Sequence, residues 1–429
     1  METDKQGALA RRIVTLGSIE SHAKDAEASR SALESAESRD LKERLLKARH
    51  DQLLKNLEAE TERVGSRNVM ITVPDRDVAL LQSELARRAD LTAALPSNAL
   101  EAKFGTGISG GDWFGWLKSL FDWVDRQDAH AIVRPSSSTP EKIDDNARLA
   151  IMGDWGTGLY GAPHIAANIQ KQAPFDLLLH LGDVYYAGTK AEVQERFLDV
   201  WPTGAGKISR ALNSNHEMYS GGFGYFDLTL PTFQQGSSYF ALQNSHWLMI
   251  CLDTAYVDHD IDGQQVGWLN EVIQQGGKRK IVLFSHQQLF SRLDNQGPKL
   301  QKALKPLLES KLITAWYWGH EHNCVVYDRH PEYGLLGRCL GNGGIPSPRK
   351  QSVVSAPTAK MYGSVSWKSL AKTDESPACI VLDGPNQFVE GEQDKFDPHG
   401  YMTLEFNGST LTERVFLANG TELHLNQIS

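Results

Sequence analysis

The segment Ile313–Asn323, ITAWYWGHEHN, decides how the fold of this chain is interpreted. Its first six residues, Ile313–Trp318, form an apolar and aromatic run that predicts a buried strand. Gly319 ends the run, and His320 and His322 follow it. If a tight turn follows the strand, both imidazoles point into one small volume, where neutral imidazole is a good ligand for zinc, iron and manganese. Since 14 histidines in 429 residues produce close pairs by chance, the pair gains meaning only if other ligand types end other strands.

Length, charge and cysteine content limit the classes of function. A chain of 429 residues exceeds what one hydrophobic core usually serves, so we expect two domains or one large domain with an appendage. The net charge of -9 argues against broad nucleic-acid binding. The four cysteines form no C-x-x-C pair and are too few for a disulfide framework. Because no signal peptide and no membrane-spanning stretch is seen, we expect a cytoplasmic protein.

The first third of the sequence has a helical pattern. Residues 15–63 are rich in Ala, Glu, Lys, Arg and Leu, which predicts a long helix or a helical pair. Further helices are predicted over 77–94 and over the tryptophan-rich stretch 111–127. We expect the apolar face of the latter to pack on the other domain or on a second subunit, with a membrane contact as the alternative. The predicted organisation is a helical region at 1–133, a polar linker at 134–147 and a second domain at 148–429.

From Arg148 onward, predicted strands alternate with predicted helices. The strands are expected at 149–154, 176–186, 211–217, 281–286 and 313–318, with a hairpin at 238–256. The helices are expected at 164–172, 191–201, 263–275 and 299–310. This alternation predicts an α/β fold with helices packed on sheets.

The remaining part of the chain is predicted to add strands and a loop. Strands are expected at 324–330 and 333–344, and a long polar loop at 346–377 that could cover a crevice. In the closing stretch, 399–426, apolar and polar residues alternate around two Asn-Gly turns. Such turns are hairpin signals, so this stretch is predicted to complete a second sheet.

A dinucleotide-binding fingerprint competes with the metal interpretation. GTGLYG, residues 156–161, fits G-x-G-x-x-G after a strand and before a helix, with Asp176 about 20 residues further on. This interpretation leaves the potential ligands at the ends of the other strands unexplained. An interpretation that uses all of them is preferred.

Six potential ligands share one feature, because each stands at or just beyond the carboxyl end of a predicted strand. They are Asp154, Asp183, Asn215, His286, His320 and His322. In α/β sheets these ends share a crevice, where carboxylate, amide oxygen and imidazole together suit a mixed oxygen and nitrogen metal site. Six ligands are too many for one four-coordinate zinc and suit two metals that share a carboxylate, about 3.5–4 Å apart. Taken singly, each residue could instead cap a helix, hold a turn or fill the core.

Five motifs in sequence order resemble those of the calcineurin-like metallophosphoesterases, and most closely those of purple acid phosphatases. The family pattern is GDxG, GDxxY, GNH(D/E), VxxH and GHxH. It appears here as Gly153–Gly156, Gly182–Tyr186, Ser214–Glu217, Val282–His286 and Gly319–His322. The resemblance covers about 149–345 and implies a sandwich of two sheets flanked by helices. Ser214 replaces the glycine of GNH and Leu283 the valine of VxxH, and neither change removes a ligand.

The resemblance assigns the ligands residue by residue. It implies one metal held by Asp154, Asp183, Tyr186 and His322, and another held by Asp183, Asn215, His286 and His320. Since a phenolate favours a trivalent ion, Fe(III) is expected at the first site, and Fe(II), Zn(II) or Mn(II) at the second. The alternative for Tyr186 is a packed aromatic side chain beside Tyr185.

The activity implied by the resemblance is hydrolysis of small phosphate monoesters by a metal-bound hydroxide. His216 is assigned to phosphate binding and to protonation of the leaving group, with Glu217 orienting it. Asn215 is also expected to contact the substrate, and Arg338 and Asn342 are further candidates, with turn and surface roles as their alternative. A phosphodiesterase on the same centre is the alternative activity. A non-catalytic scaffold is the alternative from another class, and it predicts no metal in the purified protein.

Overall fold

A computed structural model of the chain describes residues 75–91 and 129–429. Helix α4 (Arg76–Leu91) belongs to one compact unit, and residues 130–218 and 222–429 form the other. Helix α4 occupies the place of the helix predicted over 77–94, whereas the helices predicted over 15–63 and 111–127 lie outside the described residues. In the part of the chain that the structure describes, no helix is long and apolar enough to cross a membrane.

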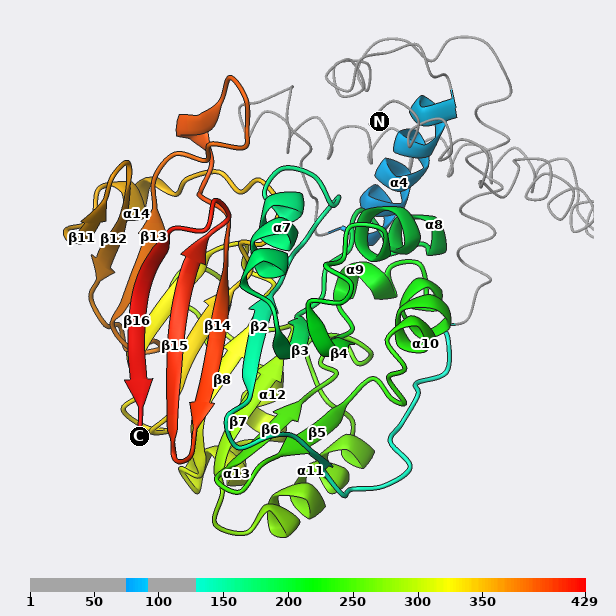
Figure 1. Cartoon of the computed structure of the whole chain (residues 1–429), viewed down its shortest axis with the longest axis vertical. Helices are drawn as coiled ribbons and strands as arrows, with labels where there is room; N and C mark the ends of the chain where they lie inside the picture. The colour runs from blue at the N-terminus through cyan, green and yellow to red at the C-terminus, as the bar shows by residue number, and fades with distance from the viewer. Residues whose placement is uncertain (1–74, 92–128) are drawn as a thin grey trace, which may run out of the picture. The chain divides into compact units, whose positions relative to one another are not determined.

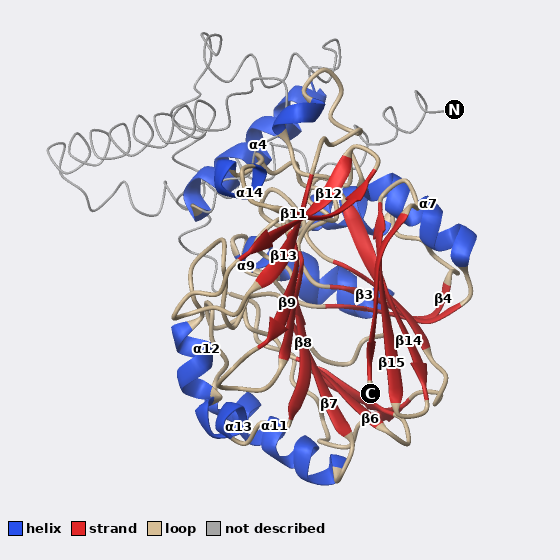
Figure 2. Ribbon diagram, turned by 90° about the vertical axis from the view of Figure 1, so that its left-hand side faces the viewer, coloured by secondary structure: helices blue, strands red, loops and turns tan. Residues whose placement is uncertain are grey.

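Two mixed sheets form the larger unit (Figures 1 and 2). The six-stranded sheet has the order β16-β15-β14-β2-β3-β4. Its strands are β2 (Arg148–Met152), β3 (Phe175–His180), β4 (Gly206–Ala211), β14 (Gly400–Asn407), β15 (Thr410–Leu417) and β16 (Glu422–Ile428). Strands β2, β3 and β4 are parallel to one another, and β14 to β16 are antiparallel, as the two Asn-Gly turns predict.

The ten-stranded sheet has the order β1-β5-β6-β7-β8-β10-β9-β13-β12-β11. Strands β6, β7 and β8 are parallel, and β5 and β6 form the predicted hairpin. Its strands are β1 (Glu141–Lys142), β5 (Phe240–Gln243), β6 (Trp247–Cys251), β7 (Lys280–Ser285), β8 (Ile313–Trp318), β9 (Cys324–Arg329), β10 (Leu336–Leu340), β11 (Thr358–Tyr362), β12 (Val365–Leu370) and β13 (Cys379–Asp383).

The central strands are buried on both faces, which explains why they are continuous apolar runs in the sequence. In β2, Leu149 and Ile151 point into the core between the two sheets, while Ala150 and Met152 point into the core beneath a helix layer. In β7, Val282 and Phe284 face the other sheet, while Ile281 and Leu283 face outward. The predicted sandwich of two sheets flanked by helices is therefore confirmed.

Helices cover the outer face of each sheet (Figure 2). Helix α7 (Ala162–Gln172) packs Ile165 and Ile169 against the six-stranded sheet. Helices α11 (Gly263–Gly276), α12 (Pro298–Ala303) and α13 (Lys305–Glu309) pack against the ten-stranded sheet. Shorter helices connect the strands: α8 (Lys190–Glu192), η1 (Val193–Leu198), α9 (Asn215–Met218), η2 (Tyr225–Thr229), α10 (Leu230–Thr232), α14 (Gln351–Val354) and η3 (Gln393–Lys395).

Three predicted elements were wrong in type or in position. The strand predicted at 211–217 runs from Gly206 to Ala211, and helix α9 follows it. The strand predicted at 176–186 ends at His180, because the next residues turn to place Asp183. The loop predicted at 346–377 contains α14, β11 and β12, and the two strands extend the ten-stranded sheet at its edge.

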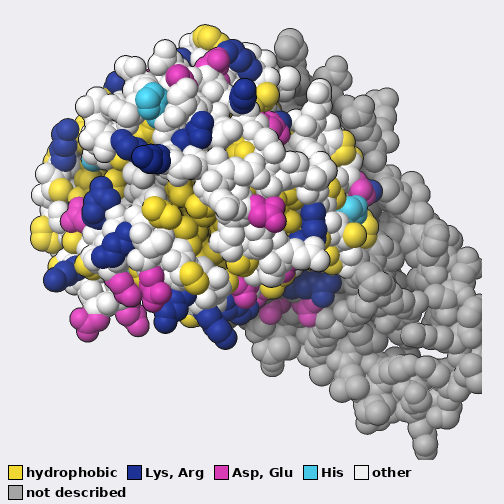
Figure 3. Space-filling view, turned by 90° about the horizontal axis from the view of Figure 1, so that it is seen from below, with side chains coloured by type: hydrophobic (Ala, Val, Ile, Leu, Met, Phe, Trp, Pro, Cys, Tyr) yellow, Lys and Arg dark blue, Asp and Glu magenta, His cyan; other side chains and the backbone are white. Residues whose placement is uncertain are grey.

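The segment predicted to be a linker, 134–147, contacts the larger unit closely. Strand β1 pairs with β5. The guanidinium group of Arg134 forms a bidentate ion pair with the carboxylate of Asp262. The face of the molecule in Figure 3 carries basic and acidic side chains interspersed around apolar ones.

Candidate metal centre

All six residues predicted from strand ends lie at one edge of the sandwich, where the carboxyl ends of parallel strands from both sheets meet. Asp154 follows β2, Asp183 follows β3 and Asn215 opens α9 after β4, all on the six-stranded sheet. His286 follows β7, and His320 and His322 follow β8, on the ten-stranded sheet. The site therefore joins the two sheets.

The backbone is strained at four of these residues. Asp154, Asp183, His320 and His322 have φ angles of 56°, 76°, 68° and 51°, in the left-handed region that non-glycine residues rarely adopt. Each such residue costs on the order of 1–3 kcal/mol and persists only where the surroundings enforce it. Gly319 leaves room for one of these side chains, because a Cβ at this position would lie 2.4 Å from Oδ2 of Asp154.

One cluster brings together Asp183, His286 and His320, whose potential ligand atoms all lie within 4.8 Å of one another. The amide oxygen of Asn215 joins it, 2.9 Å from Nε2 of His286 and 3.1 Å from Nδ1 of His320. The Nδ1 of His286 lies 2.8 Å from the carbonyl oxygen of Leu181. Because a carbonyl only accepts, Nδ1 of His286 carries the proton, and Nε2 turns a lone pair toward the cluster.

A second cluster brings together Asp154, Asp183 and His322, again with ligand atoms within 4.8 Å of one another. Nε2 of His322 lies 3.5 Å from Asp154 Oδ1 and 3.8 Å from Asp183 Oδ2. Asp183 belongs to both clusters, as expected of a carboxylate that bridges two metals. The structure thus groups the aspartates, Asn215 and the histidines as the resemblance implies, and Tyr186 is the one implied ligand outside the two clusters.

The electrostatics of the site fit a bound cation. Asp154 and Asp183 are 0% and 1% exposed, and Oδ1 of each has no hydrogen-bond partner. Burial and the neighbouring Asp183 carboxylate raise the pKa of Asp154 well above its usual range. Although burial opposes it, the imidazoles of His286 and His216 hold the pKa of Asp183 well below its usual range. Buried carboxylates, an amide oxygen and imidazole lone pairs that face one another are a donor set that a metal ion satisfies.

Tyr185, rather than the predicted Tyr186, presents its hydroxyl group to the site. This hydroxyl lies 2.7 Å from Asp183 Oδ2 and 2.6 Å from His322 Nε2. The ring of Tyr186 instead lies 5.3 Å from the Arg196 guanidinium group. The reason is local pairing: Tyr185 N donates to the Gly156 carbonyl and Gly156 N donates to the Asp183 carbonyl. This bridge between Gly156 and Val184 holds the turn in a position from which the side chains of both Asp183 and Tyr185 reach the site.

His216 is buried beside the two clusters. Its Nδ1 lies 2.6 Å from the carbonyl oxygen of Tyr186, and its ring centroid lies 3.9 Å from that of Tyr185. Burial lowers the pKa of His216 to about 4. The hydroxyl of Ser214, the residue that replaces the glycine of GNH, donates to the carboxylate of Glu217 and accepts from the His216 amide. Glu217 therefore reaches the backbone amide of His216 through Ser214, while the imidazole is held by the Tyr186 carbonyl.

The two further candidates for substrate contact, Arg338 and Asn342, make contacts away from the two clusters. Arg338 points into the core between the sheets, where its guanidinium group donates to both oxygens of Glu413 at 2.9 Å. The amide nitrogen of Asn342 donates to the carbonyl of Pro398 at 3.0 Å, and the residue is 2% exposed. Arg338 is therefore held in the core by Glu413, whereas the side-chain oxygen of Asn342 has no hydrogen-bond partner among the described residues.

The sequence interpretation missed His259. It lies in the loop after β6, and its Nε2 is 3.4 Å from Nε2 of His320. The signal that could have found it is the one used for the other residues, because β6 is parallel to β7 and its carboxyl end opens at the same edge.

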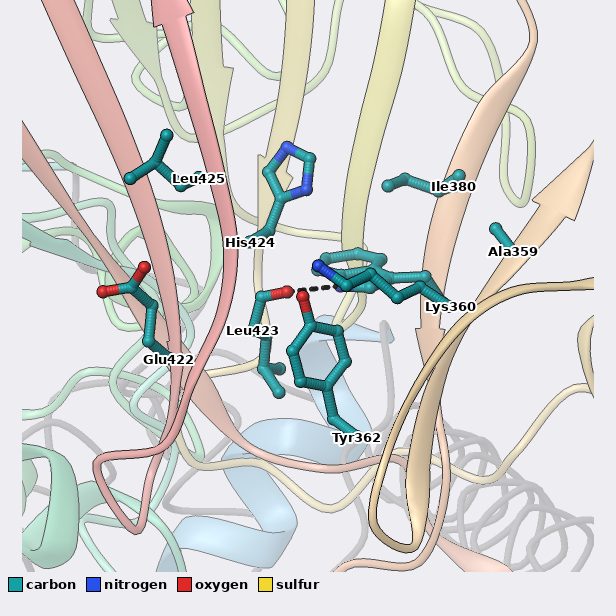
Figure 4. A pocket seen from close by; sticks show the side chains of 9 residues that line it. Ala359, Lys360, Tyr362, Ile380, Glu422, Leu423, His424 and Leu425 are labelled. Atoms are coloured by element: carbon teal, nitrogen blue, oxygen red, sulfur yellow. Dashed lines mark hydrogen bonds between the residues drawn. The ribbon is translucent and has the colours of Figure 1, made fainter.

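A cavity of about 480 Å³ lies elsewhere, between the β11–β13 edge of one sheet and strand β16 of the other (Figure 4). Lys360, Tyr362 and His424 line it, and none of the residues predicted for the metal centre does. The cavity therefore belongs to the edge of the sandwich and not to the candidate centre.

Comparisons with known proteins agree with this geometry. Residues 147–324 match the model of the calcineurin-like phosphoesterase family. No curated protein matches the sequence.

The solved structures that match this chain are distant in sequence. Purple acid phosphatase PPD1 from yellow lupin (Lupinus luteus) seeds is 14% identical, with a TM-score of 0.49 over 69% of this chain. The match spans only 55% of the lupin chain. A predicted phosphoesterase from Streptococcus pneumoniae TIGR4 is 10% identical, with a TM-score of 0.30 over 66% of this chain and 98% of its own. Vps29 from Entamoeba histolytica, complexed with zinc, is 9% identical, with a TM-score of 0.28 over the same shares.

The matched family segment contains every strand end that contributes to the two clusters, from Asp154 to His322. It also contains the five motifs in their expected order. Over residues 147–324, this chain is therefore similar to the calcineurin-like phosphoesterase family.

Proposed function

We propose that this chain is a dimetal phosphohydrolase that cleaves small phosphate monoesters. The observation that carries the proposal is the sharing of the Asp183 carboxylate by two clusters of potential ligands. Asp154, Asp183 and His322 would hold one ion, and Asp183, Asn215, His286 and His320 the other. Two bound metal ions would supply Lewis acidity toward phosphate oxygens and a water of lowered pKa.

The side chains of the chain itself position the reacting groups. His286 is fixed by its bond to Leu181, and Asp154 by the His320 amide, which donates to its Oδ2 at 2.9 Å. His216 is fixed by the Tyr186 carbonyl through its Nδ1. When its Nε2 also carries a proton, His216 would contact the phosphate of the substrate and donate that proton to the leaving oxygen. Little covalent chemistry by the protein is needed in phosphoryl transfer, because positioning and charge stabilisation supply most of the catalysis.

We further propose that the centre is of the purple acid phosphatase type, with Tyr185 supplying the phenolate. The support is the placement of its hydroxyl between Asp183 and His322. A hard phenolate oxygen together with two carboxylates favours a trivalent ion, so Fe(III) is proposed for this side. Fe(II), Zn(II) or Mn(II) is proposed for the side of Asn215 and His286.

The experiment that tests the proposal combines metal analysis with turnover. The purified full-length protein is expected to hold two metal ions per chain by mass spectrometry. It is expected to hydrolyse p-nitrophenyl phosphate faster than bis-p-nitrophenyl phosphate. The variant His286→Ala should lose more than about 100-fold in kcat/KM, since even residues that only support ligands contribute 10- to 100-fold.

The matched control is His246→Ala, because His246 is an exposed histidine in the turn between β5 and β6. It should keep the metal content and the rate of the wild type. Faster cleavage of the diester would replace the monoesterase with a phosphodiesterase. If the protein holds no metal after incubation with iron, zinc or manganese, the proposed enzyme activity is overturned and a non-catalytic scaffold is favoured.

A further inference from the structure

The orientation of His320 sets a requirement that the metal clusters do not meet. Its Nδ1 faces the cluster, 3.1 Å from the Asn215 oxygen and 3.2 Å from His286 Nε2. A neutral imidazole that offers its Nδ1 lone pair carries its proton on Nε2. Metal-binding histidines generally donate this second N–H to a fixed acceptor, which holds the ring orientation and the tautomer. His286 meets this rule through Leu181, and His320 needs an acceptor of its own.

His259 lies where that acceptor is needed. Its Nε2 lies 3.4 Å from Nε2 of His320, with the two ring planes at 82° to each other. Its Nδ1 lies 2.7 Å from Oδ1 of Asp258. Since the carboxylate accepts the proton of Nδ1, the Nε2 of His259 keeps a lone pair for the N–H of His320. The chain of donors and acceptors is therefore complete from Asp258 to the metal cluster.

The turn that carries this pair is held in place at both ends. The Val257 carbonyl accepts from the Asp260 amide at 2.8 Å, which closes the turn around Asp258 and His259. Lys299, from helix α12, donates to the Asp258 carbonyl at 2.8 Å. His259 itself has a φ of 56°. An anchored turn after β6 thus presents a histidine to a residue after β8.

We propose that His259, oriented by Asp258, is a positioning residue that fixes His320 as a metal ligand. The role rests on the proposed function, since it presumes a metal at the Asn215, His286 and His320 cluster. It concerns this cluster alone, because the described contacts of His259 do not reach Asp154 or His322. Removal of His259 would free the His320 ring to rotate and would weaken the metal at this cluster only.

The test is metal affinity, measured without reference to turnover. The full-length protein is stripped of metal with a chelator and titrated with Mn(II) against a chromophoric competitor. The wild type is expected to bind two ions. His259→Ala should bind one of them 10- to 100-fold more weakly, the range observed for groups that support metal ligands. His259→Gln keeps an acceptor oxygen and should recover part of the affinity, and Asp258→Ala should show a smaller loss.

His246→Ala is again the matched control and should bind as the wild type does. If His259→Ala binds both ions within twofold of this control, the proposal is overturned. Unchanged metal affinity with a raised KM would also overturn it, by making His259 a substrate contact. If the wild type itself binds no metal, the proposed function falls, which is distinguishable from failure of the His259 role alone.

Discussion

Tyr185 and Tyr186 show what spacing can and cannot predict at the scale of single residues. The motif spacing selects Tyr186, and the structure places Tyr185 against Asp183 and His322. Ligand types and strand ends are visible in the sequence. The side on which a residue emerges after a strand depends on loop pairing, here with Gly156, which the sequence does not reveal.

This placement predicts opposite results for two conservative variants. A tyrosinate bound to Fe(III) gives a visible absorption band through charge transfer from the phenolate to the iron. Tyr185→Phe removes the only hydroxyl that the described contacts bring between Asp183 and His322, so this band should disappear. Tyr186→Phe should keep the band. Absorption spectra of the two iron-loaded proteins check this. If the band is lost in Tyr186→Phe alone, Tyr186 is the metal ligand, as the motif spacing predicts.

Gly182 lies where a side chain would push against the centre. Its φ is 103°, and a Cβ would lie 2.8 Å from Ser214 Cβ and 2.9 Å from His286 Nδ1. Gly182→Ala should therefore lower both stability and metal content, with about 1–3 kcal/mol from the backbone alone. Gly204→Ala is the control, because Gly204 has a φ of 85° and no atom within 4 Å of its Cβ position.

The two alanine variants separate backbone strain from contact. Thermal unfolding should show destabilisation in both, and mass spectrometry should show metal loss in Gly182→Ala only. Equal metal content in the two proteins would mean that the contact with His286 does not position this ligand.

At the scale of elements, the loops around α7 depend on a buried histidine. Nδ1 of His399 accepts from the amide of Gly161, which precedes α7, and its Nε2 donates to the Ile345 carbonyl, both at 3.1 Å. Burial lowers the pKa of His399 to about 4 from 6.5. In the folded state the imidazole is neutral, and between pH 6.5 and 4 the unfolded chain binds a proton that the folded chain does not.

His399 therefore contributes stability that is complete above pH 6.5 and is lost as the pH falls toward 4, by at most about 3 kcal/mol. Asp397 acts in the opposite direction, since burial and Asp383 raise its pKa to about 8. Because Asp397 is present in both proteins, its contribution cancels when the wild type is compared with His399→Gln. The difference in unfolding free energy between wild type and variant, measured in urea, should shrink from pH 7 to pH 4. A constant difference would contradict the assignment.

Elements were predictable where the apolar pattern was strong. The buried strands β2, β7 and β8 and helices α7 and α11 are found within about two residues of their predicted bounds. The strand expected at 211–217 begins at Gly206 instead, since KISRA is mostly polar and half-exposed. The sequence does not predict the edge strand β11 for the same reason, because TAKMY has little apolar pattern and faces solvent.

At the scale of the whole molecule, one buried ion pair ties the two sheets together. Arg338 is on β10 of the ten-stranded sheet and Glu413 on β15 of the six-stranded sheet, and they are 2% and 1% exposed. The Tyr317 hydroxyl and the Asn426 amide also donate to Glu413. The sequence could not predict this pair, because an arginine near the candidate centre is more readily assigned to substrate than to the core.

Breaking this pair from one side should destabilise the sandwich far more than removing it whole. Glu413→Ala leaves the Arg338 charge buried without its partner and should cost about 3–5 kcal/mol, while Arg338→Met with Glu413→Leu should recover most of the loss. Arg414→Ala, on the same strand, removes two partly exposed pairs, with Glu405 and Glu422, and should cost less than about 1 kcal/mol for each pair. Urea unfolding of the three variants measures these differences. If Glu413→Ala and Arg414→Ala cost the same, the buried ion pair adds nothing to the contact between the sheets. Their shared apolar core alone would then hold the candidate metal centre at their edge.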